Sequence, residues 1–516
     1  MAQLSRRELI GAAVGAAGGA LPSSSALAQE RPPGGSPNLV LVVIDSLRPD
    51  HLGCYGAPRV QTPTLDALAG RGMLMSRAFP EAMATVPARR SIFTGERIFP
   101  FRDWVLHPGI GASPGWAPIG DPARTFTSVL RSHGYWTGFV SDNPHMAGNP
   151  WHEPFRRSFD RTIAVPGRSG SIAPPERVPL RQARRWLPPG MRDEHTVAVM
   201  RRFLANHGEG EDESRTGSAR VFSEAAGLLS TAAMQKPFAR VIDCFDPPEP
   251  WAPTADYLEM YSEDDYRGPE VGTLKYQRAE NYLRERDLRR MRTVYAATVT
   301  MMDHWLGVFM RRLRRLRLER NTAIVVLSDH GLLLGDRGWT GKIPNELHPE
   351  LAQVPFVLVH PEARGAGSVS QHFATTSDVG PTLLSLAGLP VPPWMEGLDL
   401  SPLFDGAEPA EQRRFHYGGY FNRFYLRTDD WALLGDAGGV ELELYDLTLD
   451  RYERKDVAQR HRDVREGLYA QLLDVVGGPL PRYELDLNEL RAIPYGTQPF
   501  RIEPTLGRQA ASAPSA

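Results

Sequence analysis

Five short runs of apolar residues recur along the chain, and each has the length of a β-strand. The run at 38–44, Asn-Leu-Val-Leu-Val-Val-Ile, has no alternating polar positions, which is typical of a strand covered on both faces of a parallel sheet. The other runs lie at 137–140, 238–242, 322–327 and 354–359. Helical patterns separate several of them, at 64–71, 125–133, 288–318 and 379–387. This alternation predicts an α/β fold with a large, mostly parallel central sheet flanked by helices.

A second, smaller unit is expected after the main domain. The sequence becomes polar and rich in Pro and Glu at 402–413, and then holds three apolar runs and one helical pattern, at 424–427, 431–434, 441–445 and 462–475. This order predicts a small antiparallel sheet with one helix. We therefore expect a main domain at 38–405, a C-terminal subdomain at 406–500 and a disordered tail at 501–516.

The first residues have the pattern of an export signal. An Arg-Arg pair stands at 6–7, a weakly apolar Ala/Gly stretch follows at 11–20, and Ala-Leu-Ala at 26–28 offers a cleavage site. The apolar stretch is too short and too rich in Gly to span a membrane, and no other segment reaches spanning length. We expect a periplasmic or secreted mature chain without an integral membrane segment, preceded by a Tat signal at 1–28 and a linker at 29–37.

Composition excludes some function classes. The 516 residues are 41% hydrophobic and 23% charged, with a formal net charge of -2, as in ordinary soluble proteins. Because there is no basic excess, we expect no nucleic-acid partner. The Arg-rich segment at 311–320 ends a helical pattern, where cations suit the helix dipole. Cys54 and Cys244 are too few for a disulfide framework, and we expect free thiols.

Acidic and histidine residues follow two of the predicted strands. Asp45 comes directly after the run at 38–44, and Asp329 and His330 come after the run at 322–327. Ligand sites in α/β sheets form beyond the carboxyl ends of strands, so these side chains are expected to meet. Either motif alone is explained as well by a hydrogen-bonded loop. Together, two carboxylates and an imidazole predict a divalent metal site.

A hydroxyl and an arginine stand at the start of another predicted helix, in Thr-Val-Pro-Ala-Arg at 85–89. Pro87 suits a first helical turn. A helix N-terminus favours an anion, and Arg89 adds a fork of donors that fits a tetrahedral oxyanion. Considered alone, the segment is better explained as a helix that Thr85 simply caps.

The order of these motifs resembles the sulfatase family of the alkaline phosphatase superfamily. The likeness extends from about residue 37 to Tyr-Asp-Leu at 445–447, and includes Asp-Pro-Pro-Glu-Pro-Trp at 246–251, Gly-Lys at 341–342, Val-Pro-Phe at 354–356 and Asp-Val-Gly-Pro-Thr at 378–382. The resemblance implies an alkaline-phosphatase-like fold and a hydrolase that acts on a small-molecule anionic ester, either a sulfate or a phosphate.

The same resemblance implies roles for individual residues. Asp45, Thr85, Asp329 and His330 would hold one divalent cation, which would be Ca²⁺, Mg²⁺ or Mn²⁺, with Zn²⁺ as a further option. Arg89 and Lys342 would anchor the ester oxygens. His145, in Ser-Asp-Asn-Pro-His at 141–145, matches an active-site histidine.

Four positions depart from the family pattern. Thr85 stands where sulfatases carry the Cys or Ser that is oxidised to formylglycine, and threonine cannot form that aldehyde. Ser46 replaces a second aspartate, and Asn143 replaces a lysine. Pro248 replaces a histidine that is a candidate general acid, which leaves His145 as the remaining candidate.

The departure at Thr85 changes the expected chemistry. A formylglycine hydrate releases sulfate by elimination, whereas a threonine sulfate ester has no such route. A phosphothreonine can be cleaved by attack of water at phosphorus, so Thr85 favours phosphate mono- or diesters, or phosphonate esters. Phosphodiesterases of the superfamily with a threonine nucleophile use a second metal. We expect one metal, because the candidate ligands for a second site have no suitable local pattern. These candidates are Asp243, Asp246, His348 and His372.

Two alternatives stay open from the sequence. The chain is either an exported hydrolase or a catalytically degenerate relative that binds an anionic ligand. The changes at Thr85, Asn143 and Pro248 favour degeneration, whereas the retained Asp45, Asp329, His330, Arg89 and Lys342 favour activity. A structural or partner-binding protein is a third option, which the export signal weakly disfavours.

The twin-arginine motif predicts the fate of an export variant. Replacing Arg6 and Arg7 by lysine should leave uncleaved chain inside the cell, because the pair is the feature by which the pathway recognises the signal. Cell fractionation and mass spectrometry of the N-terminus measure this, and the wild type should begin near Gln29. Unchanged export and cleavage of the double variant would rule out a Tat signal.

Overall fold

The computed structural model describes residues 35–105, 113–166, 173–208, 210–232, 237–263 and 266–483. The predicted signal at 1–28, most of the linker and the predicted tail at 501–516 lie outside these residues, as do residues 484–500 of the predicted C-terminal subdomain. In the described part of the chain no helix is long and apolar enough to cross a membrane. Cys54 and Cys244 are free thiols, as predicted.

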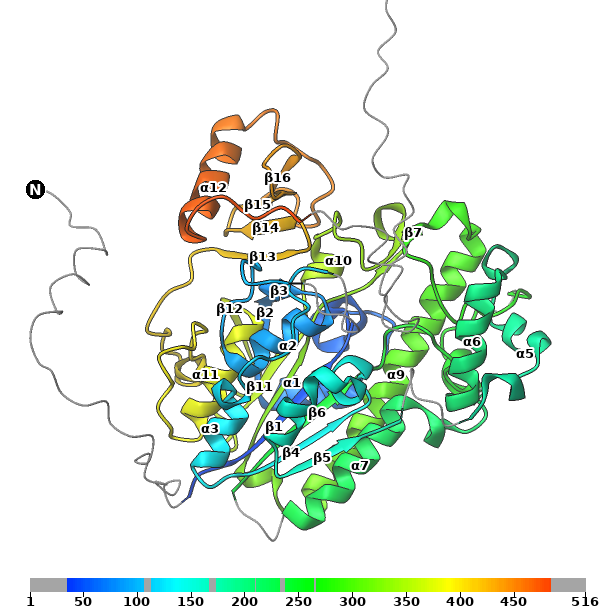
Figure 1. Cartoon of the computed structure of the whole chain (residues 1–516), viewed down its shortest axis with the longest axis horizontal. Helices are drawn as coiled ribbons and strands as arrows, with labels where there is room; N and C mark the ends of the chain where they lie inside the picture. The colour runs from blue at the N-terminus through cyan, green and yellow to red at the C-terminus, as the bar shows by residue number, and fades with distance from the viewer. Residues whose placement is uncertain are drawn as a thin grey trace, which may run out of the picture.

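The large sheet has β1 near its centre, and its described strands follow the order β12-β2-β11-β8-β1-β6-β4-β5 (Figure 1). β1 pairs in parallel with both β6 and β8. β11 runs antiparallel to β8 and β2, and the other pairs are parallel, which confirms the predicted mostly parallel sheet. The bounds are Asn38–Ile44 for β1, Met73–Ala78 for β2, Trp136–Ser141 for β4, Arg161–Ala164 for β5, Phe238–Cys244 for β6, Thr322–Ser328 for β8, Phe356–Val359 for β11 and Ser368–Ala374 for β12.

Helices cover both faces of this sheet, which explains why β1 is apolar at successive positions. Val40 and Val42 face one core, together with α1 (Pro63–Arg71), α7 (Gly217–Ala232) and the long α9 (Glu285–Arg315). Leu39 and Leu41 face the other, together with α2 (Thr85–Thr94), α3 (Phe126–Ser132) and α11 (Val379–Leu386). Figure 1 shows α7 and α9 on one side of the strands and α3 and α11 on the other. Side chains alternate between the faces of a strand, so both sets are buried.

The predicted C-terminal subdomain forms a second sheet beside the main domain, at the top of Figure 1. Its antiparallel strands and its helix are β13 (His416–Tyr420), β14 (Arg423–Arg427), β15 (Trp431–Asp436), β16 (Leu442–Asp446) and α12 (Arg462–Val475). The small sheet with one helix is therefore confirmed. A fifth strand, β3 (Ala82–Met83), joins this sheet in parallel with β13, although it belongs to the main domain in sequence.

β3 ties the C-terminal sheet to the start of α2. Gly419 lies opposite Ala82, and the Tyr425 hydroxyl donates a hydrogen bond of 2.6 Å to the carbonyl of Pro80. At Gly418 a Cβ atom would lie 2.6 Å from the carbonyl oxygen of Glu81, so glycine is required for this close approach. The backbone immediately before Thr85 is therefore held by a sheet whose other strands lie more than 300 residues later.

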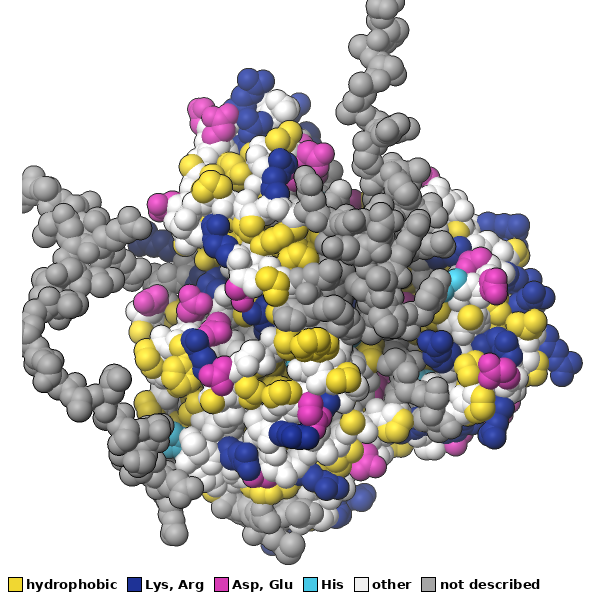
Figure 2. Space-filling view, viewed as in Figure 1, with side chains coloured by type: hydrophobic (Ala, Val, Ile, Leu, Met, Phe, Trp, Pro, Cys, Tyr) yellow, Lys and Arg dark blue, Asp and Glu magenta, His cyan; other side chains and the backbone are white. Residues whose placement is uncertain are grey.

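The remaining elements surround the carboxyl end of the central sheet and one flank of the molecule. A three-stranded sheet is formed by β7 (Gln277–Arg278), β10 (Trp339–Gly341) and β9 (Leu333–Leu334). The shorter helices are α4 (Glu153–Arg157), α5 (Leu180–Arg185), α6 (Glu194–His207), α8 (Ala255–Glu259) and α10 (Pro349–Ala352). Figure 2 shows basic side chains gathered over the margin that α5 and α6 form, with acidic side chains among them.

Candidate active site

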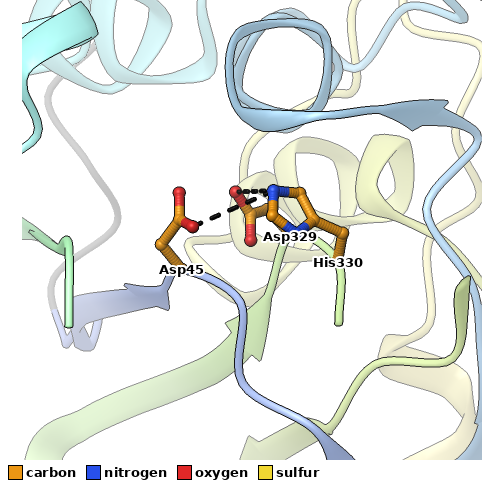
Figure 3. A group of neighbouring side chains, drawn as sticks. All are labelled: Asp45, Asp329 and His330. Carbon is orange, nitrogen blue, oxygen red and sulfur yellow. Dashed lines mark ion pairs between the residues drawn. The ribbon is translucent and has the colours of Figure 1, made fainter. Parts of the chain in front are cut away.

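The structure brings Asp45, Asp329 and His330 together at the carboxyl ends of two neighbouring strands. Asp45 follows β1, and the other two follow β8, which pairs with β1 in parallel. One ligand atom from each side chain lies within 4.8 Å of the others, and all three residues are fully buried. In Figure 3 the His330 ring points at both carboxylates. The convergence that the strand pattern predicted is therefore present.

The orientation of His330 suits a metal ligand. Its Nδ1 lies 2.9 Å from the carbonyl oxygen of Gly331, and because a carbonyl can only accept, Nδ1 carries the proton. Its Nε2 has no hydrogen-bond partner among the described residues, and it faces Asp329 Oδ2 at 3.4 Å and Asp45 Oδ1 at 3.9 Å. A neutral imidazole whose other nitrogen donates to a carbonyl is the usual arrangement of a ligating histidine.

The buried carboxylates of Asp45 and Asp329 repel one another, although Arg89 pairs with both. Burial raises the pKa of Asp329 well above its usual value, and the neighbouring Asp45 adds to this effect although Arg89 opposes it. For Asp45, burial also opposes ionisation, but the charges of Arg89, His330 and Lys342 together outweigh it and lower the pKa. Two buried carboxylates and a bare imidazole nitrogen that converge on one point fit a divalent cation, which would offset their repulsion.

Thr85 is the first residue of α2, but it does not cap the helix. No side-chain capping hydrogen bond is formed at the N-cap, which is Ala84. The Thr85 hydroxyl instead donates to Asp45 Oδ2 at 3.3 Å, in a nearly fully buried position. The interpretation of Thr85 as a simple cap is therefore wrong, and its hydroxyl lies beside the proposed metal ligands.

Arg89 lies one turn after Thr85 on α2 and is fully buried. Its guanidinium donates to Asp243 Oδ1 at 2.7 Å and 3.2 Å, to Asp329, and to the carbonyl of Thr85 at 3.3 Å. It also pairs with Asp45 at 3.2 Å. Its three nitrogen atoms thus face protein oxygens. The structure gives Arg89 the role of holding the carboxylates, and the expected contact with ester oxygens stays a prediction.

Asp243 is a functional-site residue whose part the sequence did not assign. It lies in β6, next to β1, and its second oxygen accepts a hydrogen bond of 3.0 Å from the Ser141 hydroxyl. Its position at a strand end was the one available signal. Because two nitrogens of Arg89 donate to this carboxylate, Asp243 balances the charge of the arginine.

Ser46 occupies the place of the family's second aspartate without its charge. Its backbone has φ 54°, its amide donates to Asp329 Oδ1 at 3.0 Å, and its hydroxyl donates to Asp45 Oδ1 at 2.7 Å. Ser46 therefore positions both carboxylates by hydrogen bonds.

His145 lies at the edge of the site, on a short turn at Pro144–Gly148. Its ring packs edge-on against Trp116, with ring centroids 4.9 Å apart, and near Phe245. Burial, with help from the charges of Arg89 and Lys342, lowers the pKa of His145 to about 4. The ring is therefore neutral at neutral pH. This makes His145 a weak candidate for the general acid that the family's histidine would supply at position 248.

Lys342 directly follows β10 and contacts two residues that sequence analysis did not single out as functional. Its ammonium donates to the Tyr276 hydroxyl at 2.9 Å, and lies 3.7 Å from Glu249 Oε2. Glu249 stands within the segment 246–251 that carries part of the family likeness, next to the departure at Pro248. Tyr276 has no such signal, because it reaches Lys342 through strand pairing and not through sequence proximity.

The four residues weighed for a second metal site have other contacts or do not converge. Within the described residues, Asp45, Asp329 and His330 are the one group of three or more potential ligands close enough to hold an ion. Asp246 accepts a hydrogen bond from the amide of Ser218 at the start of α7. His348 contacts Glu453 at 2.8 Å. The described residues therefore offer one candidate metal site, and the number of bound ions stays a prediction.

Comparison with known proteins identifies the family of this chain. The family model "Sulfatase" matches residues 37–389, and the model "N-sulphoglucosamine sulphohydrolase, C-terminal" matches residues 335–476. An N-acetylglucosamine-6-O-sulfatase of Bacteroides thetaiotaomicron is 23% identical, with 82% of each chain covered. A choline-sulfatase of Rhizobium meliloti is 25% identical, with 83% of each chain covered.

A solved structure shares the fold over most of its length. The phosphonate monoester hydrolase of Agrobacterium radiobacter has a TM-score of 0.65 at 22% identity, over 86% of this chain and 95% of that one. The predicted alkaline-phosphatase-like fold is therefore confirmed. Because the sulfatase model spans well over half of the sequence, the chain belongs to the sulfatase family of ester-bond hydrolases, within the alkaline phosphatase superfamily.

Proposed function

We propose that this protein is an exported, metal-dependent hydrolase of small anionic esters, with Thr85 as a nucleophile that favours phosphate mono- or diesters or phosphonate esters over sulfate esters. The observation that carries the proposal is the buried Thr85 hydroxyl, 3.3 Å from Asp45 and beside Asp329 and His330. The family membership supports ester hydrolysis, and the likeness to a phosphonate monoester hydrolase supports chemistry at phosphorus.

One divalent cation fits the residues of this site. Asp45, Asp329 and His330 would hold it, with the Thr85 hydroxyl completing the set. When bound, the cation would stabilise negative charge on the threonine oxygen and on the transferred group. Oxygen-rich ligation favours Ca²⁺, Mg²⁺ or Mn²⁺, although His330 also suits Zn²⁺.

The chain's own residues define the two halves of the reaction. In the first half, the Thr85 hydroxyl loses its proton to solvent, and Oγ1, held by its contact with Asp45, forms a bond to phosphorus while the bond to the leaving oxygen breaks. In the second half, water attacks phosphorus, the bond to Thr85 Oγ1 breaks, and the proton that water loses restores the threonine hydroxyl. Lys342, whose charge contributes to the lowered pKa of Asp45, would hold the ester oxygens, and the helix N-terminus at Thr85 would favour their charge.

The second candidate function is anion binding without turnover. The loss of a histidine at Pro248 and the low pKa of His145 favour this function, since neither residue can protonate a poor leaving group at neutral pH. The buried Thr85 hydroxyl beside Asp45 favours catalysis, because anion binding alone requires no nucleophile.

Removal of Asp45 should abolish metal binding. The wild type should hold about one ion per chain after dialysis, and Asp45→Ala should hold a much smaller fraction, because one of two carboxylate ligands is lost. Elemental analysis measures both. Asp463→Ala, at an exposed position at the start of α12, is the matched control and should keep the wild-type content. Unchanged metal in Asp45→Ala would contradict the site.

Ester preference separates a threonine nucleophile from formylglycine chemistry. Aryl phosphate, bis-aryl phosphate and aryl phosphonate esters should turn over, whereas aryl and alkyl sulfates should stall or remain unused. Good leaving groups should react fastest, because Pro248 cannot protonate a departing alkoxide. Initial rates with each of the four cations measure this preference. Sustained turnover of an alkyl sulfate would reject the proposed order.

Substitution of Thr85 tests the nucleophile directly. Thr85→Ala should lose roughly 1,000-fold or more in kcat, whereas Thr85→Ser should keep much of the activity because it keeps the hydroxyl. Quenching the wild type with a phosphate ester at low pH should trap a phosphothreonine on the peptide that contains residue 85, which mass spectrometry identifies. An active Thr85→Ala protein, with no label on that wild-type peptide, would remove Thr85 from the mechanism.

A further inference from the structure

Glu249, Tyr276 and Lys342 form a connected polar group beside the proposed metal site. The Lys342 ammonium donates to the Tyr276 hydroxyl at 2.9 Å, and that hydroxyl donates to Glu249 Oε1 at 2.6 Å. The other carboxylate oxygen, Oε2, lies 3.7 Å from the same ammonium. The Lys342 and Glu249 side chains are about nine-tenths buried, with 10% and 11% of their surface exposed.

The local backbone explains how these residues meet. β7 begins directly after Tyr276 and pairs with β10, which ends directly before Lys342, so the two side chains lie together. Gly341 has φ 94°, and a Cβ atom there would lie 2.7 Å from the Tyr276 ring, so glycine lets the ring pack against the backbone. Trp251 is fully buried and anchors the loop that carries Glu249 through a hydrogen bond to the carbonyl of Pro247.

The second carboxylate oxygen of Glu249, Oε2, is the unusual feature of this group. Glu249 Oε2 is buried and accepts no hydrogen bond from the described residues, although it faces the lysine. A buried carboxylate oxygen without a donor is costly and is retained where its charge has a use. Lys342 is also close enough to Asp45 and His330 that its charge influences their ionisation. Glu249 therefore contributes a negative charge next to the lysine that faces the ester.

We propose that Glu249 is a specificity-determining residue that makes the site prefer esters with one negative charge over esters with two. This inference rests on the proposed function, because it assumes that Lys342 contacts the ester oxygens. It adds a substrate class: phosphate diesters and phosphonate monoesters, which carry one charge, in preference to phosphate monoesters, which carry two near pH 8.

The distances set the size of the effect. An oxygen that bonds to Lys342 lies about 3 Å from its ammonium. Since Glu249 Oε2 lies 3.7 Å from the same nitrogen, the bound group lies within about 7 Å of the carboxylate. At this distance, and at the effective dielectric of a protein site, a second negative charge is disfavoured by a factor of about ten or more. Tyr276 holds the carboxylate in place, so it cannot turn away.

Two non-hydrolysable anions of the same shape isolate this effect. Phenylphosphonate and benzenesulfonate differ by one charge at about pH 8.5, above the second pKa of the phosphonate group. Calorimetry in the presence of Mn²⁺ gives the two dissociation constants, and their ratio is the measured quantity. Because neither probe is turned over, the ratio can be measured even if the protein hydrolyses no ester. Failure of the hydrolase proposal would be seen in the ester rates, which are a separate measurement.

Glu249→Gln should tighten binding of phenylphosphonate relative to benzenesulfonate by about tenfold, because it removes the charge and keeps the shape. Glu249→Ala should shift the ratio in the same direction, and Glu249→Asp should restore it toward the wild-type value. Glu280→Gln removes an exposed carboxylate near β7 and should leave the ratio unchanged. A thermal melt confirms that each protein is folded. An unchanged ratio in both Glu249→Gln and Glu249→Ala, or an equal shift of both anions, would overturn the proposal.

Discussion

The contact between Arg89 and three carboxylates is the interaction on which the site depends. Its guanidinium holds Asp243 at 2.7 Å, Asp45 at 3.2 Å and Asp329, and each of these comes from a different strand of the central sheet. All four side chains are fully buried. Removing one partner of a buried ion pair typically costs about 3–5 kcal/mol, because the other charges are left without compensation. Thus the arginine fixes the spacing of the carboxylates. A bound cation would balance only the part of their negative charge that Arg89 does not balance.

The C-terminal subdomain extends this constraint to Thr85. Because Thr85 and Arg89 are four residues apart, they lie on the same face of α2, so the position of the helix sets both. β3 ends two residues before Thr85 and is a strand of the C-terminal sheet, held there by Gly419 and by the hydrogen bond from Tyr425 to Pro80. The subdomain is therefore a structural support for Thr85, the proposed nucleophile. A substitution in β13 would act on Thr85 through the backbone of β3.

Sequence alone predicted the parts of this structure that local pattern determines. The apolar runs became β1, β4, β6, β8 and β11, and the helical pattern at 462–475 matches α12. Asp45, Asp329 and His330 could be predicted to meet because parallel strands end at one edge of a sheet. β3 was missed because two residues carry no periodicity, and its partner strand is distant in sequence. The contact between Tyr276 and Lys342 was missed for the same reason, since it depends on the pairing of β7 with β10.

The departures from the family pattern at Ser46, Asn143 and Pro248 are better explained together than one by one. Ser46 removes a carboxylate from the metal site, and Asn143 removes a lysine, so these two changes lower charge of both signs near Thr85. Pro248 removes a histidine, but the next residue, Glu249, reaches Lys342 through Tyr276. The Ser46 hydroxyl and amide bond to Asp45 and Asp329, whereas the buried Nδ2 of Asn143 has no hydrogen-bond partner among the described residues. Of the replaced positions, Ser46 has become part of the hydrogen-bond network that holds both carboxylates, which is what the proposed adaptation to a different ester requires at this position.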